Sequence, residues 1–275
     1  MKTLHLVPVL AATLATALSA GAARAGASDW AKGFESRIRL ISADGPANAA
    51  GEREAGIDLA LEPGWKTYWR QPGDAGVPPS FDFSASRNLA SARVLYPAPK
   101  RFVEGGVVSA GYSGSLVFPV LVTAKDPAAP VELVLKADYG ICRETCVPAS
   151  GDVGLTIAAD APRDIGAAVP IGVAMRKVPV APQASGLRVE SVTVAADGLD
   201  IAVRLDDAGA DGDLFAEGPA DWYLPLPELQ GRDGDLARFR LELASRPAGA
   251  PIAGAAFVFT ATNGSRAIEQ NWRLD

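Results

Sequence analysis

Two cysteines are the residues of this sequence whose type and spacing point most directly to chemistry. Cys142 and Cys146 lie in the segment YGICRETCVPASG (139–151), and they are the only two cysteines among 275 residues. With three residues between them, the pair can close a local disulfide, contribute to a metal site, or exchange disulfides with other proteins. The remaining sequence gives these three chemistries different weight.

The composition disfavours a metal site. The sequence has one histidine, His5, which lies in an N-terminal segment that we expect to be removed, and Met175 is then its one methionine. A chain without histidine has no Ser-His-Asp or Cys-His catalysis, no His-ligated zinc and no Met/His copper site. Two cysteines alone make a poor tetrahedral site, so we expect no metal and no cofactor.

The N-terminus has the pattern of a secretory signal peptide. Lys2 precedes an uncharged apolar run at 6–20, and Ala23-Arg24-Ala25 is a small-x-small cleavage pattern. The run is shorter than the ~20 apolar residues that span a bilayer. No later run is long enough, so we expect a signal peptide at 1–25, a periplasmic protein, and no membrane insertion after cleavage.

Charge excludes one class of partner. Cleavage after Ala25 lowers the number of lysines and arginines from 26 to 24, against 32 acidic residues, which leaves a formal charge of −8. Nucleic-acid binding and docking on anionic lipid both need a basic surface. We therefore expect protein partners and no nucleic acid.

The elements that position the cysteines are predicted to be strands. Short period-two runs at 36–42, 55–64, 131–140 and 151–160 are bounded by turn residues, and the cysteine segment joins the last two runs. This pattern predicts an all-β domain over 26–160. An Ala-, Pro- and Gly-rich stretch at 161–186 reads as a linker with a short helix near 165–177. Hairpin patterns then resume and predict a second, smaller β-sandwich domain at 187–275.

A passive disulfide and a redox pair remain as alternatives for the cysteines. Closing a ring of about five residues stabilises a fold by only ~2 kcal/mol, against ~4–5 kcal/mol for rings near 100 residues. Small rings on tight loops also tend to be labile. Arg143 between the cysteines favours a thiolate, whereas Glu144 opposes it. These arguments favour the redox role.

Two further stretches are unusual. The segment LEPGWKTYWRQPGDAGVPPSFDF (61–83) gathers aromatic residues around two Pro-Gly turns, and the segment 96–120 holds a Gly-rich loop. The aromatic residues are either ordinary core residues or a rim that screens the cysteine loop. The Gly-rich loop is suited to act as a lid.

These motifs, taken in order, resemble a known family. PGWKTYWRQPGDAGVPPSF, then YPAPKRF…GY…FPV, then YGICRETCVP are similar to the N-terminal periplasmic domain of the thiol:disulfide interchange protein DsbD. The similarity is greatest to the longer form found in suppressor-of-copper-sensitivity membrane reductases, and it covers about residues 30–160. It implies that the first domain is an immunoglobulin-like β-sandwich. Residues 187–275 resemble the extra domain of the longer proteins.

The resemblance also implies roles for particular residues. Cys142 and Cys146 would carry electrons, with Cys146 as the attacking thiolate and Cys142 as the resolving thiol. A cap loop shields the family's site, and the span Phe102–Tyr112 matches it here. The residues expected to bind or cap the pair are Tyr68, Trp69, Phe102, Tyr112 and Tyr139.

The sequence thus predicts a periplasmic protein-disulfide reductase component that needs no cofactor. Electrons would pass through Cys142 and Cys146 between a membrane thiol reductase system and periplasmic thiol or disulfide proteins. The sequence shows neither membrane helices nor a thioredoxin-like domain, so we expect a separately encoded reductase to supply them. The alternative is a non-catalytic binding or scaffold module with a passive disulfide, linked to copper tolerance or cytochrome c maturation.

Overall fold

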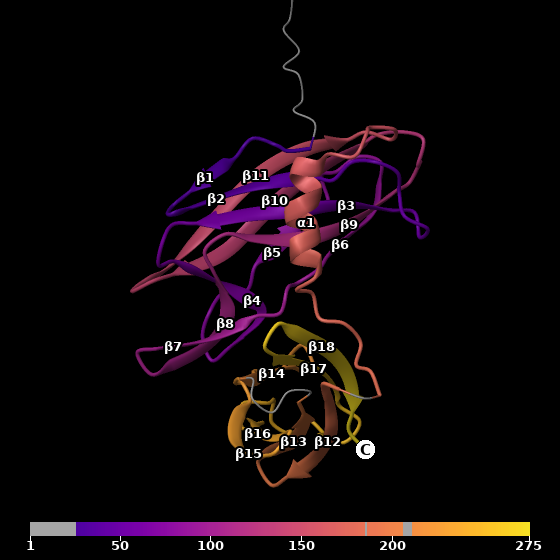
Figure 1. Ribbon diagram of the computed structural model, residues 1–275. Coiled ribbons are helices and arrows are strands. Elements are labelled where there is room, and N and C mark those ends of the chain that lie inside the picture. The colour runs from indigo at the N-terminus through magenta and orange to yellow at the C-terminus, as the bar shows by residue number, and fades with distance from the viewer. Residues whose placement is uncertain (1–25, 185, 206–210) are drawn as a thin grey trace, which may run out of the picture.

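The structure is a computed structural model that describes residues 26–184, 186–205 and 211–275. The predicted signal peptide at 1–25 lies outside the described residues. The described chain forms two β-rich domains, and the single helix among the described residues lies along the first of them (Figure 1). The predicted all-β fold class is confirmed.

The first domain is a sandwich of two antiparallel sheets. One sheet has the order β1 (Ala31–Gly33), β2 (Ser36–Ser42), β3 (Glu52–Leu61), β9 (Leu116–Ala124) and β6 (Leu89–Val94). The other has the order β11 (Cys146–Ile157), β10 (Val131–Cys142), β4 (Lys66–Gly73), β8 (Val107–Ser113) and β7 (Lys100–Glu104), with β5 (Ser80–Asp82) paired to β10.

Alternating side chains bury the inner faces of these sheets. On β10, Val131, Leu133 and Leu135 are fully buried, whereas Glu132 and Lys136 between them are exposed. Phe118 of β9 lies in the middle of the core and packs against three other aromatic rings, those of Phe81, Tyr96 and Tyr112. This core holds the sheet that carries the cysteines against its partner sheet.

The second domain is a smaller sandwich with its own core. Its first sheet has the order β12 (Arg188–Ala195), β13 (Gly198–Arg204), β16 (Leu236–Glu242) and β15 (Glu228–Asp233). Its second sheet has the order β14 (Gly212–Glu217), β17 (Ala256–Asn263) and β18 (Arg266–Arg273). Trp222, Phe239 and Phe259 are among the buried residues between them.

The stretch expected to be a linker does more than join the domains. Its helix α1 (Ile165–Met175) begins at Asp164, whose carboxylate accepts a hydrogen bond from the Ala167 amide. The buried face of α1 packs on the outer face of the first sheet, where Ile171 and Ala168 meet Ile41. Figure 1 shows α1 lying across β3 and β9, so part of the 161–186 stretch is integral to the first domain.

The two domains meet at β4 and β7 of the first domain. The Trp69 ring packs edge-on against Phe215, with 5.7 Å between the ring centroids. Arg70 binds Glu217 at 2.6 Å and also pairs with Glu269. Burial by itself would lower the pKa of Arg70, but the hydrogen bonds and charges of the two glutamates outweigh burial and raise that pKa above its usual value.

A second arginine clamp lies beside the first. Arg101 of β7 grips the Asp213 carboxylate with two nitrogens, at 2.7 and 3.0 Å, and donates to the Pro227 carbonyl at 2.8 Å. A bidentate arginine–carboxylate pair fixes orientation as well as distance. The interface therefore fixes β4 and β7 against the second domain.

Replacing Arg70 by alanine tests this interface. The change leaves Glu217 and Glu269 close together without their shared cation, and we expect the free energy of unfolding to fall by about 2 kcal/mol. Differential scanning calorimetry measures the loss, and separate unfolding of the two domains is expected to become visible.

The matched control is Arg87→Ala, because the Arg87 side chain is 80% exposed, against 26% for Arg70, and pairs with Glu132 at 3.6 Å. An exposed pair of this kind contributes about 0–1 kcal/mol. Equal losses in the two variants would contradict the assigned role of Arg70.

Candidate functional site

The β10–β11 hairpin places the two cysteines at its tip. The two strands pair without a register shift from Val131 opposite Ile157 to Cys142 opposite Cys146. Side chains at directly opposite positions of an antiparallel pair leave the sheet on the same face. The cysteines form a disulfide across this last pair, with 4.1 Å between their Cα atoms.

The two sulfur-bearing residues differ in exposure. Cys142 is 7% exposed, because it ends an inner strand that is covered on both sides. Cys146 is exposed, since it begins the edge strand β11 after a turn of three exposed residues. A thiolate of another protein therefore has access to Cys146 and little access to Cys142.

Tyr68 of β4 reaches the exposed cysteine. Its hydroxyl oxygen lies 3.1 Å from the Sγ atom of Cys146, and a disulfide sulfur carries no proton, so the hydroxyl donates. Burial raises the pKa of Tyr68, and the nearby Glu104 carboxylate raises it further. The phenol therefore stays protonated near neutral pH and remains a hydrogen-bond donor to this sulfur.

Glycine positions seat the Tyr68 ring. A Cβ atom at Gly140 would lie 3.1 Å from the ring and 3.0 Å from Val77, and a Cβ atom at Gly76 would lie 2.3 Å from the ring. Gly76 also has a φ of 130°, in the region that favours glycine. The Pro- and Gly-rich segment after β4 thus covers the ring without side-chain clashes.

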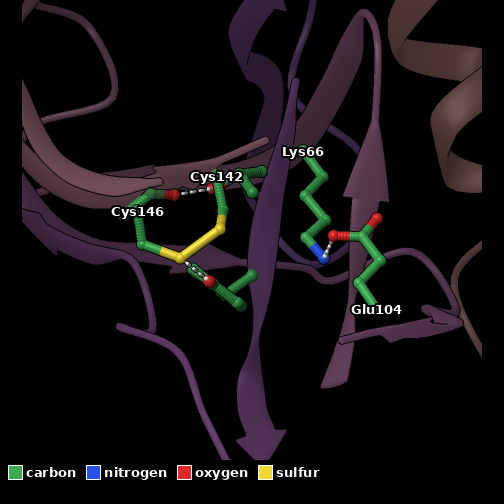
Figure 2. The surroundings of a disulfide bond; sticks show 7 residues. Lys66, Glu104, Cys142 and Cys146 are labelled. Carbon is green, nitrogen blue, oxygen red and sulfur yellow. Dashed lines mark hydrogen bonds and ion pairs between the residues drawn. A yellow bond between two sulfur atoms is a disulfide. The ribbon is translucent and has the colours of Figure 1, made fainter. Parts of the chain in front are cut away.

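Lys66 lies on the other side of Cys142. It is the register partner of Cys142 across the β10–β4 pair, so Cys146, Cys142 and Lys66 form one row across three neighbouring strands. The Lys66 side chain is only 8% exposed, and its ammonium binds the Glu104 carboxylate of β7 at 2.6 Å (Figure 2). The ring of Phe102 covers the same ammonium, with 5.2 Å from Nζ to the ring centroid.

The predicted cap span is a hairpin that reaches the site through Lys66. Strands β7 and β8 turn at Gly105 and Gly106, both at positive φ, with open space around each. Phe102 and Glu104 are two residues apart on β7 and so face the same side. The hairpin thereby places one aromatic ring and one carboxylate over the buried ammonium.

Three of the residues expected to bind or cap the pair lie elsewhere. Trp69 lies in the domain interface, the Tyr112 hydroxyl donates to the Pro97 carbonyl, and the Tyr139 hydroxyl lies 3.0 Å from the Ser36 hydroxyl. The physical reason is strand parity. Trp69 neighbours Tyr68 and Tyr139 neighbours Gly140, so their side chains leave the opposite face of the sheet and enter the core.

Arg143, which lies between the two cysteines in the sequence, is directed toward Trp65 and Gly64 in the structure. Arg143 is exposed, and its guanidinium lies over the Trp65 ring at 5.4 Å, with its stem against Gly64. No group of three or more histidine, cysteine or carboxylate side chains in the described ranges could hold a metal ion. No helix within those ranges is long and apolar enough to cross a membrane.

Sequence reasoning did not single out Lys66 or Glu104. The available signal was a lysine at the start of an aromatic stretch, with Trp65 directly before it and Tyr68 two residues after it. A cation at such a position is either exposed or paired, and the sequence alone does not say which residue pairs with it.

Replacing Tyr68 by phenylalanine tests the hydrogen bond to Cys146. In the reduced protein the hydroxyl would donate to the Cys146 thiolate, and a hydrogen bond to a charged group contributes about 1.5–3 kcal/mol. We therefore expect the thiolate fraction at a given pH to fall about tenfold or more. The pH dependence of iodoacetamide labelling of the reduced protein measures this fraction. Tyr112→Phe is the control, and identical labelling profiles for both variants would refute the role of Tyr68.

Comparison with known proteins agrees with this geometry. Residues 41–157 match the family described as thiol:disulfide interchange protein DsbD, N-terminal. The chain is also similar to the crystal structure of the N-terminal periplasmic domain of ScsB from Proteus mirabilis, with 22% identity and a TM-score of 0.71 over 90% of this chain and 98% of that chain. This likeness extends the shared fold to the second domain. No curated protein matches the chain. The resemblance predicted from three motifs is confirmed: the chain contains a DsbD N-terminal domain.

Proposed function

We propose that this protein exchanges disulfides with partner proteins in the periplasm through Cys142 and Cys146. The observation that carries the proposal is the asymmetry of the pair. Cys146 is exposed and accepts a hydrogen bond from Tyr68, while Cys142 is buried next to Lys66. One sulfur is open to attack and the other is protected, as a two-step exchange requires.

In the reducing direction the exchange takes two steps. The Cys146 thiolate attacks a partner disulfide, a mixed disulfide forms, and the partner's second sulfur leaves as a thiolate that takes a proton from solvent. Cys142 then loses its proton to solvent and attacks the Cys146 sulfur, which releases the partner's first sulfur as a thiolate. Two electrons pass to the partner, and the Cys142–Cys146 disulfide is left.

A dithiol restores the pair by the same steps in reverse. We propose a membrane thiol reductase system as the source of that dithiol, and periplasmic disulfide proteins as the acceptors. The family of the first domain supports thiol–disulfide partners in general. The signal-peptide pattern and the periplasmic location of the similar ScsB domain support the compartment.

A passive disulfide is the competing function, and its energetic contribution is small. Closing a five-residue ring stabilises a fold by about 2 kcal/mol. Both domains already bury extensive apolar cores. The long β10–β11 register also holds the tip together without a covalent bond. A passive disulfide at this position would therefore add little to the stability of the fold.

The equilibrium reduction potential separates the two functions. Titration of the purified protein against glutathione redox buffers, followed by thiol trapping and mass spectrometry, gives the value. We expect a potential between roughly −200 and −270 mV, in the range of exchanging pairs. A value well below about −300 mV would mark a structural bond and remove the proposed function.

Serine variants test which cysteine is attacked. We expect Cys142→Ser, which keeps the exposed thiol, to form a stable mixed disulfide with glutathione disulfide. We expect Cys146→Ser, which keeps only the buried thiol, to react at least about tenfold more slowly. Intact-protein mass spectrometry follows both reactions. Equal rates for the two variants would contradict the assignment of Cys146 as the attacking residue.

A further inference from the structure

Lys66 is a buried cation next to the cysteine pair, which is an unusual position for a lysine. It stands directly opposite Cys142, and such opposite pairs have their Cβ atoms about 4.5–5.5 Å apart. Its side chain is nearly withdrawn from water, which is costly for an ammonium group. An apolar residue there would pack between Phe102 and the sheet without that cost. The position therefore points to a role for the charge itself.

The charge partner of Lys66 lies on β7, the edge strand of the same sheet. Glu104 is about half-exposed and lies one residue before the Gly105–Gly106 turn of the β7–β8 hairpin. Open space surrounds both glycines of the turn. Lys66 is thus directly opposite Cys142 on the neighbouring strand, and its buried ammonium binds the Glu104 carboxylate of the hairpin (Figure 2).

We propose that Lys66 is a positioning residue that stabilises Cys142 as a thiolate when the disulfide opens. The proposal rests on the proposed function, and it assigns to Lys66 a share in the exchange step. A partner thiolate reaches the exposed Cys146 and bonds to its sulfur. The bond between the two sulfurs breaks, and Cys142 leaves with the electron pair and the negative charge. The neighbouring ammonium balances that charge, and no proton has to move in this step.

The expected consequence is kinetic as well as thermodynamic. A more stable leaving thiolate departs faster, so Lys66 speeds opening of the disulfide. In the opposite direction, a larger thiolate fraction at Cys142 speeds resolution of the mixed disulfide. Lys66 therefore promotes both the opening of the Cys142–Cys146 disulfide and its re-formation from the mixed disulfide.

Glu104 works against this effect while the hairpin is in the observed position. Its carboxylate is bonded to the ammonium and offsets the positive charge that Cys142 would feel. Removing the carboxylate leaves the charge of Lys66, opposite Cys142, without its partner. The structure thus assigns opposite effects to two residues that touch each other, and this opposition makes the proposal testable.

The experiment uses the full mature protein with Lys66→Met, Lys66→Arg and Glu104→Gln. The rate of disulfide opening by dithiothreitol is measured for each variant. The ionisation of Cys142 is then followed by ultraviolet absorbance of the thiolate, in the reduced protein with Cys146→Ser added so that one thiol remains. Lys136→Met is the matched control, since Lys136 is an exposed lysine of β10, the strand that carries Cys142, and lies opposite Asp82 and Asp152.

We expect Lys66→Met to open about tenfold more slowly, with the Cys142 thiolate appearing at higher pH. Lys66→Arg is expected to keep most of the original rate of disulfide opening. Glu104→Gln is expected to open faster, with the Cys142 thiolate appearing at lower pH. Unchanged thiolate titrations in both Lys66→Met and Glu104→Gln would overturn the proposal. Should Lys66→Met not fold, Glu104→Gln decides alone, because Glu104 is half-exposed and its replacement is isosteric.

The outcome is separable from that of the proposed function. A reduction potential below about −300 mV would remove the exchange function. The titration of Cys142 in the reduced protein does not depend on exchange with any partner. A normal potential with an unshifted Cys142 titration in the variants would remove only the role of Lys66.

Discussion

The site depends on one constraint, the register that places Cys142 between Cys146 and Lys66. Both neighbours are directly opposite Cys142, one on β11 and one on β4, so all three side chains leave one face of the sheet. A slip of one residue in either pairing would turn a member of the row into the core. The register is held by the buried alternation of β10, whose apolar residues cannot face water without loss of the core.

The second domain supports this arrangement through its interface with strands β4 and β7. Arg70 and Arg101 anchor β4 and β7 to carboxylates of the second domain, and these same strands carry Tyr68, Lys66, Phe102 and Glu104. Sites held by packed elements keep their geometry better than sites on free loops. The interface therefore gives the second domain a physical connection to the strands that surround the cysteine pair.

Two different electrostatic environments surround the two sulfurs. The exposed Cys146 faces a neutral hydroxyl that stays protonated because burial raises the Tyr68 pKa. The buried Cys142 is the register partner of Lys66, whose ammonium is paired with Glu104. A hydrogen-bond donor suits a sulfur that attacks from the surface, whereas a charge suits a sulfur that must ionise away from water. The pair is chemically unequal before any partner binds.

The sequence by itself determined the strands, the cysteine hairpin and the family. Period-two alternation is a local property, so the runs at 36–42 and 131–140 became β2 and β10, and three ordered motifs identified the DsbD N-terminal domain. Tertiary structure decided which side chains meet. Lys66 and Cys142 are far apart in the chain, and their pairing follows from sheet order. The same parity sent Trp69 and Tyr139 into the core, because alternation fixes two faces but does not say which face the disulfide occupies.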